Sequence, residues 1–265
     1  MGMPDRPRWL AVAALVAVGA VIGVGAAAAF AGSRNDEPLA RVTVAVTHTP
    51  VTTRTPTATP SPTEPGFDAS ARSVDEAGSL WVVVNKARPI DPLRYVPGDL
   101  VRLDVPGTSA TMRKAAAKAL AHMYDAASKA GARFLVSTAY RSYAIQDGIY
   151  RTYVAQKGRA YADRLSARAG YSEHQTGLAV DIYDPTGCRL TVCYANTKSG
   201  RWVAEHAAEY GFVIRYPDGK EQVTGYRFEP WHLRYVGTAL AGELRARGIA
   251  TLEEFFALPA APDYA

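Results

Sequence analysis

Apolar residues recur every three or four positions in several stretches of this chain, which is the period of an amphipathic helix. The clearest stretch starts at Met112 and continues through Leu120 and Ala127. We expect Thr108 or Ser109 to cap its start, because short polar side chains satisfy the free N–H groups of a first turn. The predicted helices span 108–131, 142–158, 200–211, 238–248 and 251–259.

Shorter apolar runs lie between these helices and are typical of strands. Residues 133–140 and 177–184 form two such runs, and residues 212–237 predict two more strands around the turn Pro217-Asp218-Gly219. Strands and helices mix without a regular strand–helix–strand alternation. The pattern therefore predicts an α+β fold with an antiparallel sheet.

The N-terminal segment has a different pattern. Arg6 and Arg8 precede residues 9–30, an uncharged and mostly apolar run that is long enough to span a bilayer. Positive charge before such a run predicts a cytoplasmic N-terminus and export of the residues after the run. Residues 1–31 are expected to be a single-pass membrane anchor; the alternative is a cleaved signal, because residues 29–31 have the shape of a cleavage site. The rest is then extracytoplasmic, at the cell membrane or secreted.

Residues 32–78 are rich in Thr and Pro and offer little apolar surface to bury. Such a composition predicts a disordered linker, which places His48 outside any site. The composition changes near Leu80, and the folded domain is expected over residues 79–258. Hydrophobic residues make up 48% of the 265 residues, which is enough for a sizeable core.

Charge and cysteine content narrow the function classes. The net charge is only +5, and no Lys/Arg-rich block interleaved with aromatic residues occurs, so no nucleic-acid partner is expected. The chain is expected to act as a monomer. Its two cysteines, Cys188 and Cys193, favour a disulfide in an exported protein, with two free thiols as the alternative.

Two histidines and an aspartate form the candidate chemistry. His174 and Asp181 lie in "SEHQTGLAVDI", and His232 lies in "FEPWHLRY". His122 and His206 lie on predicted helices without metal-ligand spacing and are expected to have surface or packing roles. Two imidazoles and a carboxylate that leave room for water are typical of a catalytic zinc site. If His232 lies on a strand antiparallel to that of Asp181, their side chains can meet on one face of the sheet.

Glu229 is the candidate proton acceptor for such a site. It lies three residues before His232, and positions three apart in a regular strand point to opposite faces. A kink at Pro230 would bring both side chains to the same metal. Glu229 would then act as general base and afterwards as general acid. The alternative is an ordinary ion pair with Arg227 or Arg234.

The chain resembles the zinc D-alanyl-D-alanine carboxypeptidases of the VanY type, whose peptidase family also includes D-Ala-D-Ala dipeptidases. The resemblance covers residues 80–237, including "VNKARPIDPLRYVPGDLV", "STAYRSYAIQ", "SEHQTGLAVDI" and the segment that ends in "FEPWHLRYVG". The family pattern S-x-H-x-x-G-x-A-x-D falls on residues 172–181, and E-x-W-H falls on residues 229–232. One departure is Ala169, which stands before Gly170 where a proline is expected.

The resemblance implies a small antiparallel sheet flanked by helices, as in the Hedgehog signalling domain, and a bound Zn²⁺. It gives Arg141 the role of binding substrate near the scissile carbonyl, which suits a permanently charged guanidinium. Gln146 and Ser172 are implied to bind substrate. Tyr140 and Trp231 are candidates to line the pocket, although both could belong to the core.

The predicted function is that of a membrane-tethered zinc metallopeptidase that releases the terminal D-alanine from peptidoglycan stem peptides. An L,D-carboxypeptidase or a cross-link endopeptidase would carry the same motifs. A non-catalytic cell-wall-binding module on this fold would be favoured by loss of Glu229, which is present. A serine peptidase is excluded by the absence of a Ser-x-x-Lys or Gly-x-Ser-x-Gly motif.

Overall fold

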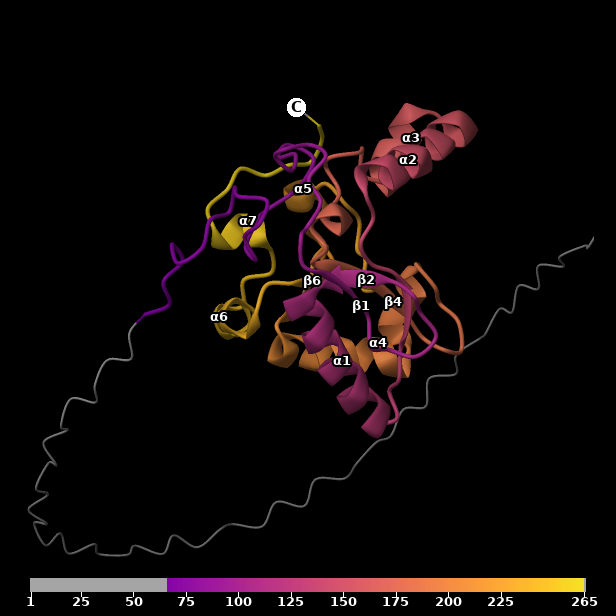
Figure 1. The fold of residues 1–265 in the computed structure, drawn as a ribbon, viewed down its shortest axis with the longest axis vertical. Coiled ribbons are helices and arrows are strands. Elements are labelled where there is room, and N and C mark those ends of the chain that lie inside the picture. The colour runs from indigo at the N-terminus through magenta and orange to yellow at the C-terminus, as the bar shows by residue number, and fades with distance from the viewer. Residues whose placement is uncertain (1–65, 265) are drawn as a thin grey trace, which may run out of the picture. The chain divides into compact units, whose positions relative to one another are not determined.

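The computed structural model describes residues 66–264 (Figure 1). The predicted membrane segment, residues 1–31, and residues 32–65 of the predicted linker lie outside this range. Among the helices of residues 66–264, none combines the length and the apolar character needed to cross a membrane.

Two antiparallel sheets organise the described residues. One pairs β1 with β2, and the other has four strands in the order β3-β4-β6-β5. The strands are β1 (Leu100–Arg102), β2 (Thr111–Arg113), β3 (Leu135–Thr138), β4 (Ala179–Tyr183), β5 (Phe212–Ile214) and β6 (His232–Tyr235). The predicted α+β class with a small antiparallel sheet is confirmed.

Helices surround these sheets. Figure 1 shows α1 close to α4, whereas α2 and α3 lie together at the other end of the molecule. The α-helices are α1 (Lys114–Lys129), α2 (Tyr143–Lys157), α3 (Arg159–Leu165), α4 (Lys198–His206), α5 (Glu221–Thr224), α6 (Thr238–Arg247) and α7 (Leu252–Phe255). Three 3₁₀ helices are η1 (Glu173–Thr176), η2 (Val192–Asn196) and η3 (Ala207–Tyr210).

The main core lies between α1 and the four-stranded sheet. Leu120 and Met123 of α1 are fully buried together with Val180 of β4 and Leu233 of β6. Burying each of these side chains contributes about 1.5–3 kcal/mol. This packing gives β4 and β6 a fixed support, and these two strands carry two of the candidate zinc ligands.

The first predicted helix starts later than expected. Residues 111–113 form β2, which pairs with β1, and α1 begins at Lys114 without a side-chain cap. Thr108 and Ser109 therefore do not cap it. Met112 is fully buried in the strand, so its apolar spacing to the helix residues did not distinguish strand from helix.

The strands predicted within residues 212–237 are present, and β5 pairs antiparallel with β6. The turn Pro217-Asp218-Gly219 does not join them as a tight hairpin, because residues 215–231 form a long connection that includes α5. This connection carries Tyr216 and Glu229 to the candidate site.

Two other helix predictions are confirmed. Ser142 caps α2, since its side chain accepts a hydrogen bond from the Ile145 N–H at 3.4 Å. The predicted helix 200–211 corresponds to α4 followed by η3. It begins two residues earlier, at Lys198 behind the cap Thr197, and ends at Gly211 in the left-handed region.

Packing extends beyond the predicted domain at both ends. Phe67 stacks on Trp81 with ring centroids 5.5 Å apart, and Val74 packs in the same apolar cluster. At the other end Ala261 is buried, and the Tyr264 ring packs edge-on against another tyrosine. The packed part therefore includes residues 67–78, which their composition assigned to the linker, and residues 259–264.

Candidate metal centre and active site

The pairing of β4 with β6 brings two candidate ligands together. Asp181 and His232 are direct partners in this antiparallel register, so their side chains leave the sheet on the same face. His232 Nδ1 lies 3.0 Å from Asp181 Oδ1. The two residues are 51 positions apart in sequence, and the sheet alone makes them neighbours.

His174 reaches the same point from η1. Gly177 ends this short helix in the left-handed region, with φ of 69°, and lets the chain turn into β4. His174 Nδ1 lies 2.6 Å from the carbonyl oxygen of Ala139, to which it donates in the matching tautomer. His174 Nε2 is then free for a metal and lies 3.2 Å from Asp181 Oδ2.

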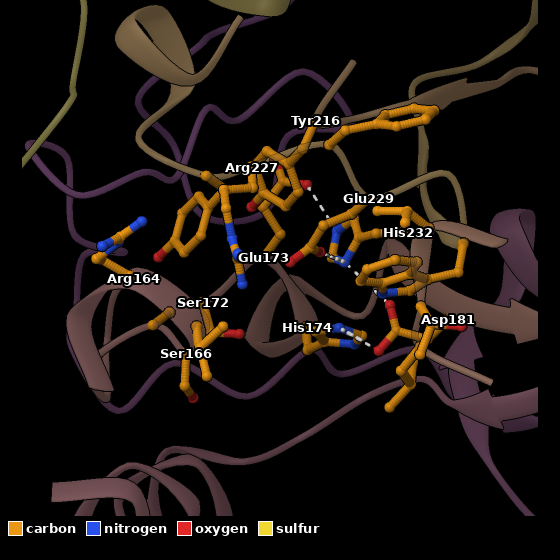
Figure 2. A pocket seen from close by; sticks show the side chains of 18 of the residues that line it. Arg164, Ser166, Ser172, Glu173, His174, Asp181, Tyr216, Arg227, Glu229 and His232 are labelled. Carbon is orange, nitrogen blue, oxygen red and sulfur yellow. Dashed lines mark ion pairs between the residues drawn. The ribbon is translucent and has the colours of Figure 1, made fainter. Parts of the chain in front are cut away.

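These three side chains form a buried donor set that fits zinc. His174, Asp181 and His232 each offer one atom within 4.8 Å of the others. Figure 2 shows their side chains converging. Asp181 Oδ1 is buried without a hydrogen-bond partner and faces His232 Nδ1 at 3.0 Å, so a cation bound between these two atoms would satisfy both. Two imidazoles and one carboxylate match the ligands of a catalytic zinc.

The electrostatics of the two histidines differ. Burial, reinforced by the Arg141 guanidinium, lowers the pKa of His174 to about 4, so its ring is neutral. Burial would also lower the pKa of His232, but the carboxylates of Asp181 and Glu173 outweigh it and raise that pKa to about 9. The carboxylates of Asp181 and Glu173 therefore favour positive charge beside His232, whereas the surroundings of His174 favour a neutral ring.

Glu229 lies beside this donor set. The His232 N–H donates to the Glu229 carbonyl at 3.1 Å, which closes a tight turn with Pro230 in its second position. The turn brings Glu229 Oε2 to 3.9 Å from His232 Nδ1. Burial raises the pKa of Glu229 to about 7 although His232 opposes it, and nearby Asp181 raises it further. A carboxyl group with this pKa can accept and return a proton near neutral pH.

Arg141 faces the same cavity. It follows β3, and its backbone N–H donates to the His174 carbonyl at 3.2 Å. Its Nε is buried without a hydrogen-bond partner. Burial lowers the pKa of Arg141, while the carboxylates of Asp181 and Glu229 act against that change. Because Arg141 lines the cavity beside the zinc ligands, its guanidinium can meet a substrate oxygen there.

The cavity has a volume of about 720 Å³, and Ser172 and Trp231 line it. Gln146 and Tyr140 are not among its lining residues. Gln146 is fully buried behind the wall, where it donates to the Ala167 carbonyl at 2.6 Å and to a serine hydroxyl. The structure thus gives Gln146 a position that supports the wall of the cavity.

Sequence reasoning missed Glu173, which lies behind His232. Its Oε2 is 3.5 Å from His232 Nε2, and its Oε1 accepts from both Arg215 and Arg234 at 2.7 Å. Arg215 also pairs with Glu253. A carboxylate behind a metal-binding histidine orients the ring. The only available signal was its place next to His174, because its arginine partners lie 42 and 61 residues away.

The other two histidines within the described residues lie elsewhere, as predicted. His122 is exposed on α1, and His206 at the end of α4 contacts Glu209 at 3.1 Å. His48 lies outside the described residues. Neither His122 nor His206 belongs to the donor set around Asp181.

The fold and this site define a zinc peptidase. The family model of VanY, a D-alanyl-D-alanine carboxypeptidase, matches residues 109–238. The YodJ protein of Bacillus subtilis (strain 168), which has a provisional carboxypeptidase name, is 34% identical over 96% of this chain and 98% of its own length. This chain belongs to the VanY carboxypeptidase family.

Two solved structures extend the comparison. The LD-carboxypeptidase LdcB, studied for peptidoglycan recognition, has 40% identity and a TM-score of 0.63 over 68% of this chain and 87% of its own. The vancomycin-resistance D,D-pentapeptidase VanY from a VanB-type cassette, a glutamate-to-alanine mutant with Zn(II), has 32% identity and a TM-score of 0.57. That match covers 68% of this chain and 99% of the other.

Proposed function

We propose that this protein is a zinc-dependent D-alanyl-D-alanine carboxypeptidase that releases the terminal D-alanine from peptidoglycan stem peptides. The observation that carries the proposal is the placement of Glu229, which lies beside three buried zinc ligands without joining them. A binding module would have no need for an acid with a pKa of about 7 at this point. The family match adds the D,D specificity.

The chain's own groups divide the chemistry between them. When bound by His174, Asp181 and His232, zinc supplies a Lewis acid that polarises the scissile carbonyl and acidifies a water molecule. Glu229 takes the proton from the attacking water. The same carboxyl group then returns the proton to the amine nitrogen of the departing D-alanine, so that acid and base roles alternate on one side chain.

Arg141 stabilises the oxygen of the scissile carbonyl, which gains negative charge during the attack by water. Its guanidinium stays protonated and lines the cavity. A preorganised donor in a buried site stabilises developing charge without having to reorganise. Arg141 follows β3, and the hydrogen bond from its backbone N–H to the His174 carbonyl of η1 fixes its position relative to His174.

A second candidate is an L,D-carboxypeptidase, which would remove D-alanine from tetrapeptide stems. The support for this candidate is the sequence identity, which is 40% to the LD-carboxypeptidase LdcB and 32% to the D,D-pentapeptidase. Both reactions use the same zinc ligands and the same base. The position of the stem peptide in the cavity decides between them.

Mass spectrometry of muropeptides tests the two candidates directly. The zinc-loaded protein is incubated with pentapeptide and tetrapeptide stems in separate reactions. The D,D activity predicts loss of one alanine from the pentapeptide, and the L,D activity predicts that loss from the tetrapeptide. Release of alanine from neither substrate would contradict the proposed function.

We also propose that residues 1–31 tether the enzyme at the outer side of the cell membrane. The support is the sequence alone: Arg6 and Arg8 before a long uncharged apolar run, followed by a Thr/Pro-rich segment. Protease added to intact spheroplasts should then digest the domain. A protein that stays fully protected in intact spheroplasts would contradict the export.

A further inference from the structure

Four apolar or aromatic side chains help to line the catalytic cavity, and we call them the apolar lip: the half-buried Ile149 and the exposed Tyr153, Leu190 and Val192. The first two come from α2, and the other two come from the loop closed by the disulfide. Leu190 is 43% exposed and Val192 is 59% exposed. Apolar side chains that are exposed beside a catalytic centre are available to contact a ligand.

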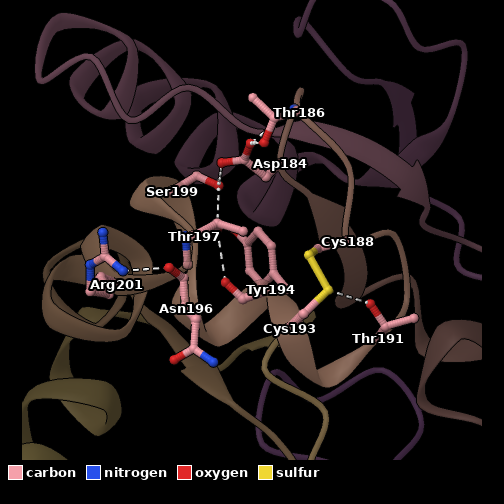
Figure 3. The surroundings of a disulfide bond; sticks show 11 residues. Asp184, Thr186, Cys188, Thr191, Cys193, Tyr194, Asn196, Thr197, Ser199 and Arg201 are labelled. Carbon is pink, nitrogen blue, oxygen red and sulfur yellow. Dashed lines mark hydrogen bonds between the residues drawn. A yellow bond between two sulfur atoms is a disulfide. The ribbon is translucent and has the colours of Figure 1, made fainter. Parts of the chain in front are cut away.

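The disulfide holds half of this lip in place. Cys188 and Cys193 are joined, with their Cα atoms 5.5 Å apart (Figure 3). Cys188 and Leu190 both have positive φ, at 58° and 52°, a backbone region that L-residues avoid unless their surroundings impose it. The loop therefore presents Leu190 and Val192 in a conformation that the cross-link helps to impose.

Hydrogen bonds anchor the same loop to the rest of the fold. The Arg189 side chain donates from Nε to Ser137 Oγ at 2.9 Å. Before the loop, Asp184 accepts from the Thr186 N–H at 2.9 Å and from the Ser199 hydroxyl at 2.8 Å. An ordered loop loses little entropy when a ligand binds, so contacts at its tip can add to affinity.

The cavity is large for the part of the substrate that leaves. A carboxypeptidase releases a single alanine, whereas about 720 Å³ is within the range of sites that enclose a drug-sized ligand. Most of that space must therefore take the stem peptide on the N-terminal side of the scissile bond. Binding energy from such remote parts can be used at the reacting centre.

We propose that the apolar lip is a substrate-binding subsite for the aliphatic part of the stem peptide, on the N-terminal side of the scissile bond. This inference rests on the proposed function. It adds the residues that bind the part of the stem peptide on the N-terminal side of the scissile bond. The lip lines the catalytic cavity, and its chemistry matches methyl and methylene groups. The disulfide keeps Leu190 and Val192 in place for this contact.

Val192→Ser tests the subsite, with Val96→Ser as the matched control. Both valines are 59% exposed, and Val96 does not line the cavity. The substrates are a stem pentapeptide and the short N-acetyl-D-Ala-D-Ala. Val192→Ser should raise KM for the pentapeptide by about 3- to 10-fold, as expected for lost apolar contact, and leave kcat/KM for the short substrate unchanged. Val96→Ser should change neither.

Binding measured without hydrolysis separates this inference from the proposed function. In a Glu229→Gln background, calorimetry should show the same loss of pentapeptide affinity for Val192→Ser, whichever bond the wild-type enzyme cuts. Equal effects on long and short substrates, unchanged affinity, or no pentapeptide binding at all would overturn the subsite.

The role of the disulfide has its own test. The double variant Cys188→Ser/Cys193→Ser should raise KM for the pentapeptide at least as much as Val192→Ser, because Leu190 and Val192 are both released. Its zinc content should equal that of the wild type. A double variant with lower thermal stability but an unchanged KM would overturn the role of the disulfide in holding the lip.

Discussion

Glu229 lies next to the zinc ligands, and its half-buried carboxyl group lines the catalytic cavity. Glu229→Gln should keep bound zinc and lower kcat by about 10²–10⁴-fold, because proton transfer from water and to the leaving amine is lost. Release of D-alanine and zinc content by mass spectrometry are the measurements. Glu221→Gln, a change on the exposed rim of the same cavity, is the control and should remain active. A fully active Glu229→Gln would remove Glu229 from the mechanism.

Glu173 compensates two buried arginines at once. Both Arg215 and Arg234 are fully buried and donate to the same Glu173 oxygen. Glu173→Gln should lower the free energy of unfolding by about 3–5 kcal/mol, because it leaves buried charge without a partner. Urea denaturation measures this loss. Asp147→Asn removes an exposed pair with Arg151 and should cost less than about 1 kcal/mol. Equal losses of unfolding free energy in the two variants would show that the buried Glu173 network contributes no more stability than an exposed ion pair.

The reactive side chains could be predicted from the sequence because each belongs to a short motif. His174, Asp181 and His232 have the types and spacing of zinc ligands, and the kink at Pro230 was expected for Glu229. The buried charges could not be predicted in this way. Glu173 becomes recognisable only once the fold brings Arg215 and Arg234 to it, and Gln146 has a motif position but lies behind the cavity wall.

At the scale of elements, the turn from η1 into β4 sets the position of His174. Gly177 has a φ of 69°, and a Cβ there would lie 2.9 Å from Arg113 Cγ and 3.0 Å from a Leu100 methyl carbon. Gly177→Ala should therefore cost more than the roughly 1–2 kcal/mol of a left-handed alanine and should weaken zinc binding. Urea denaturation and zinc titration are the measurements.

Gly248→Ala is the matched control for this turn. Gly248 has a φ of 63°, and a Cβ there would meet nothing within 4 Å. It should therefore carry the backbone cost without the steric clash, and its zinc affinity should stay at the wild-type level. Equal stability losses and equal zinc affinities in the two variants would contradict the proposed link between Gly177 and the metal site.

Element types were predictable where the apolar period was sustained, as in α2 and β4. The error at residues 108–113 has a physical cause. β2 exists because β1 pairs with it, and a three-residue strand carries too few positions to show its own period. The connection between β5 and β6 was mispredicted for a related reason, since Pro-Asp-Gly favours a turn but does not fix which strands it joins.

At the scale of the whole molecule, several carboxylates bind fewer protons in the folded state than in the unfolded chain. Burial alone would raise the pKa of Asp184, but hydrogen bonds from Thr186 and Ser199 outweigh it and hold that pKa below its ordinary value. The pKa of Glu253 is lowered against burial by Arg215. Groups with a lowered folded pKa add stability above their unfolded value, and this stability is lost as the pH falls through the folded value.

These carboxyl groups should therefore make the free energy of unfolding decrease as the pH falls from about 5 to 3, where unfolded carboxylates begin to bind protons. Urea denaturation across this range measures the dependence. Asp184→Asn, a change outside the lining of the catalytic cavity, should reduce the acid-side slope. A protein that gains stability between about pH 5 and pH 3 would contradict this account of its carboxylates.

The central claim is that three side chains from η1, β4 and β6 hold one zinc ion beside an unligated acid. Anomalous diffraction at the zinc edge, from crystals of the zinc-loaded protein, tests it most directly. The account predicts one peak about 2.0–2.1 Å from His174 Nε2 and His232 Nδ1, in contact with an Asp181 oxygen and not with Glu229. Zinc held by other residues, or by Glu229 in place of one of these three, would contradict it.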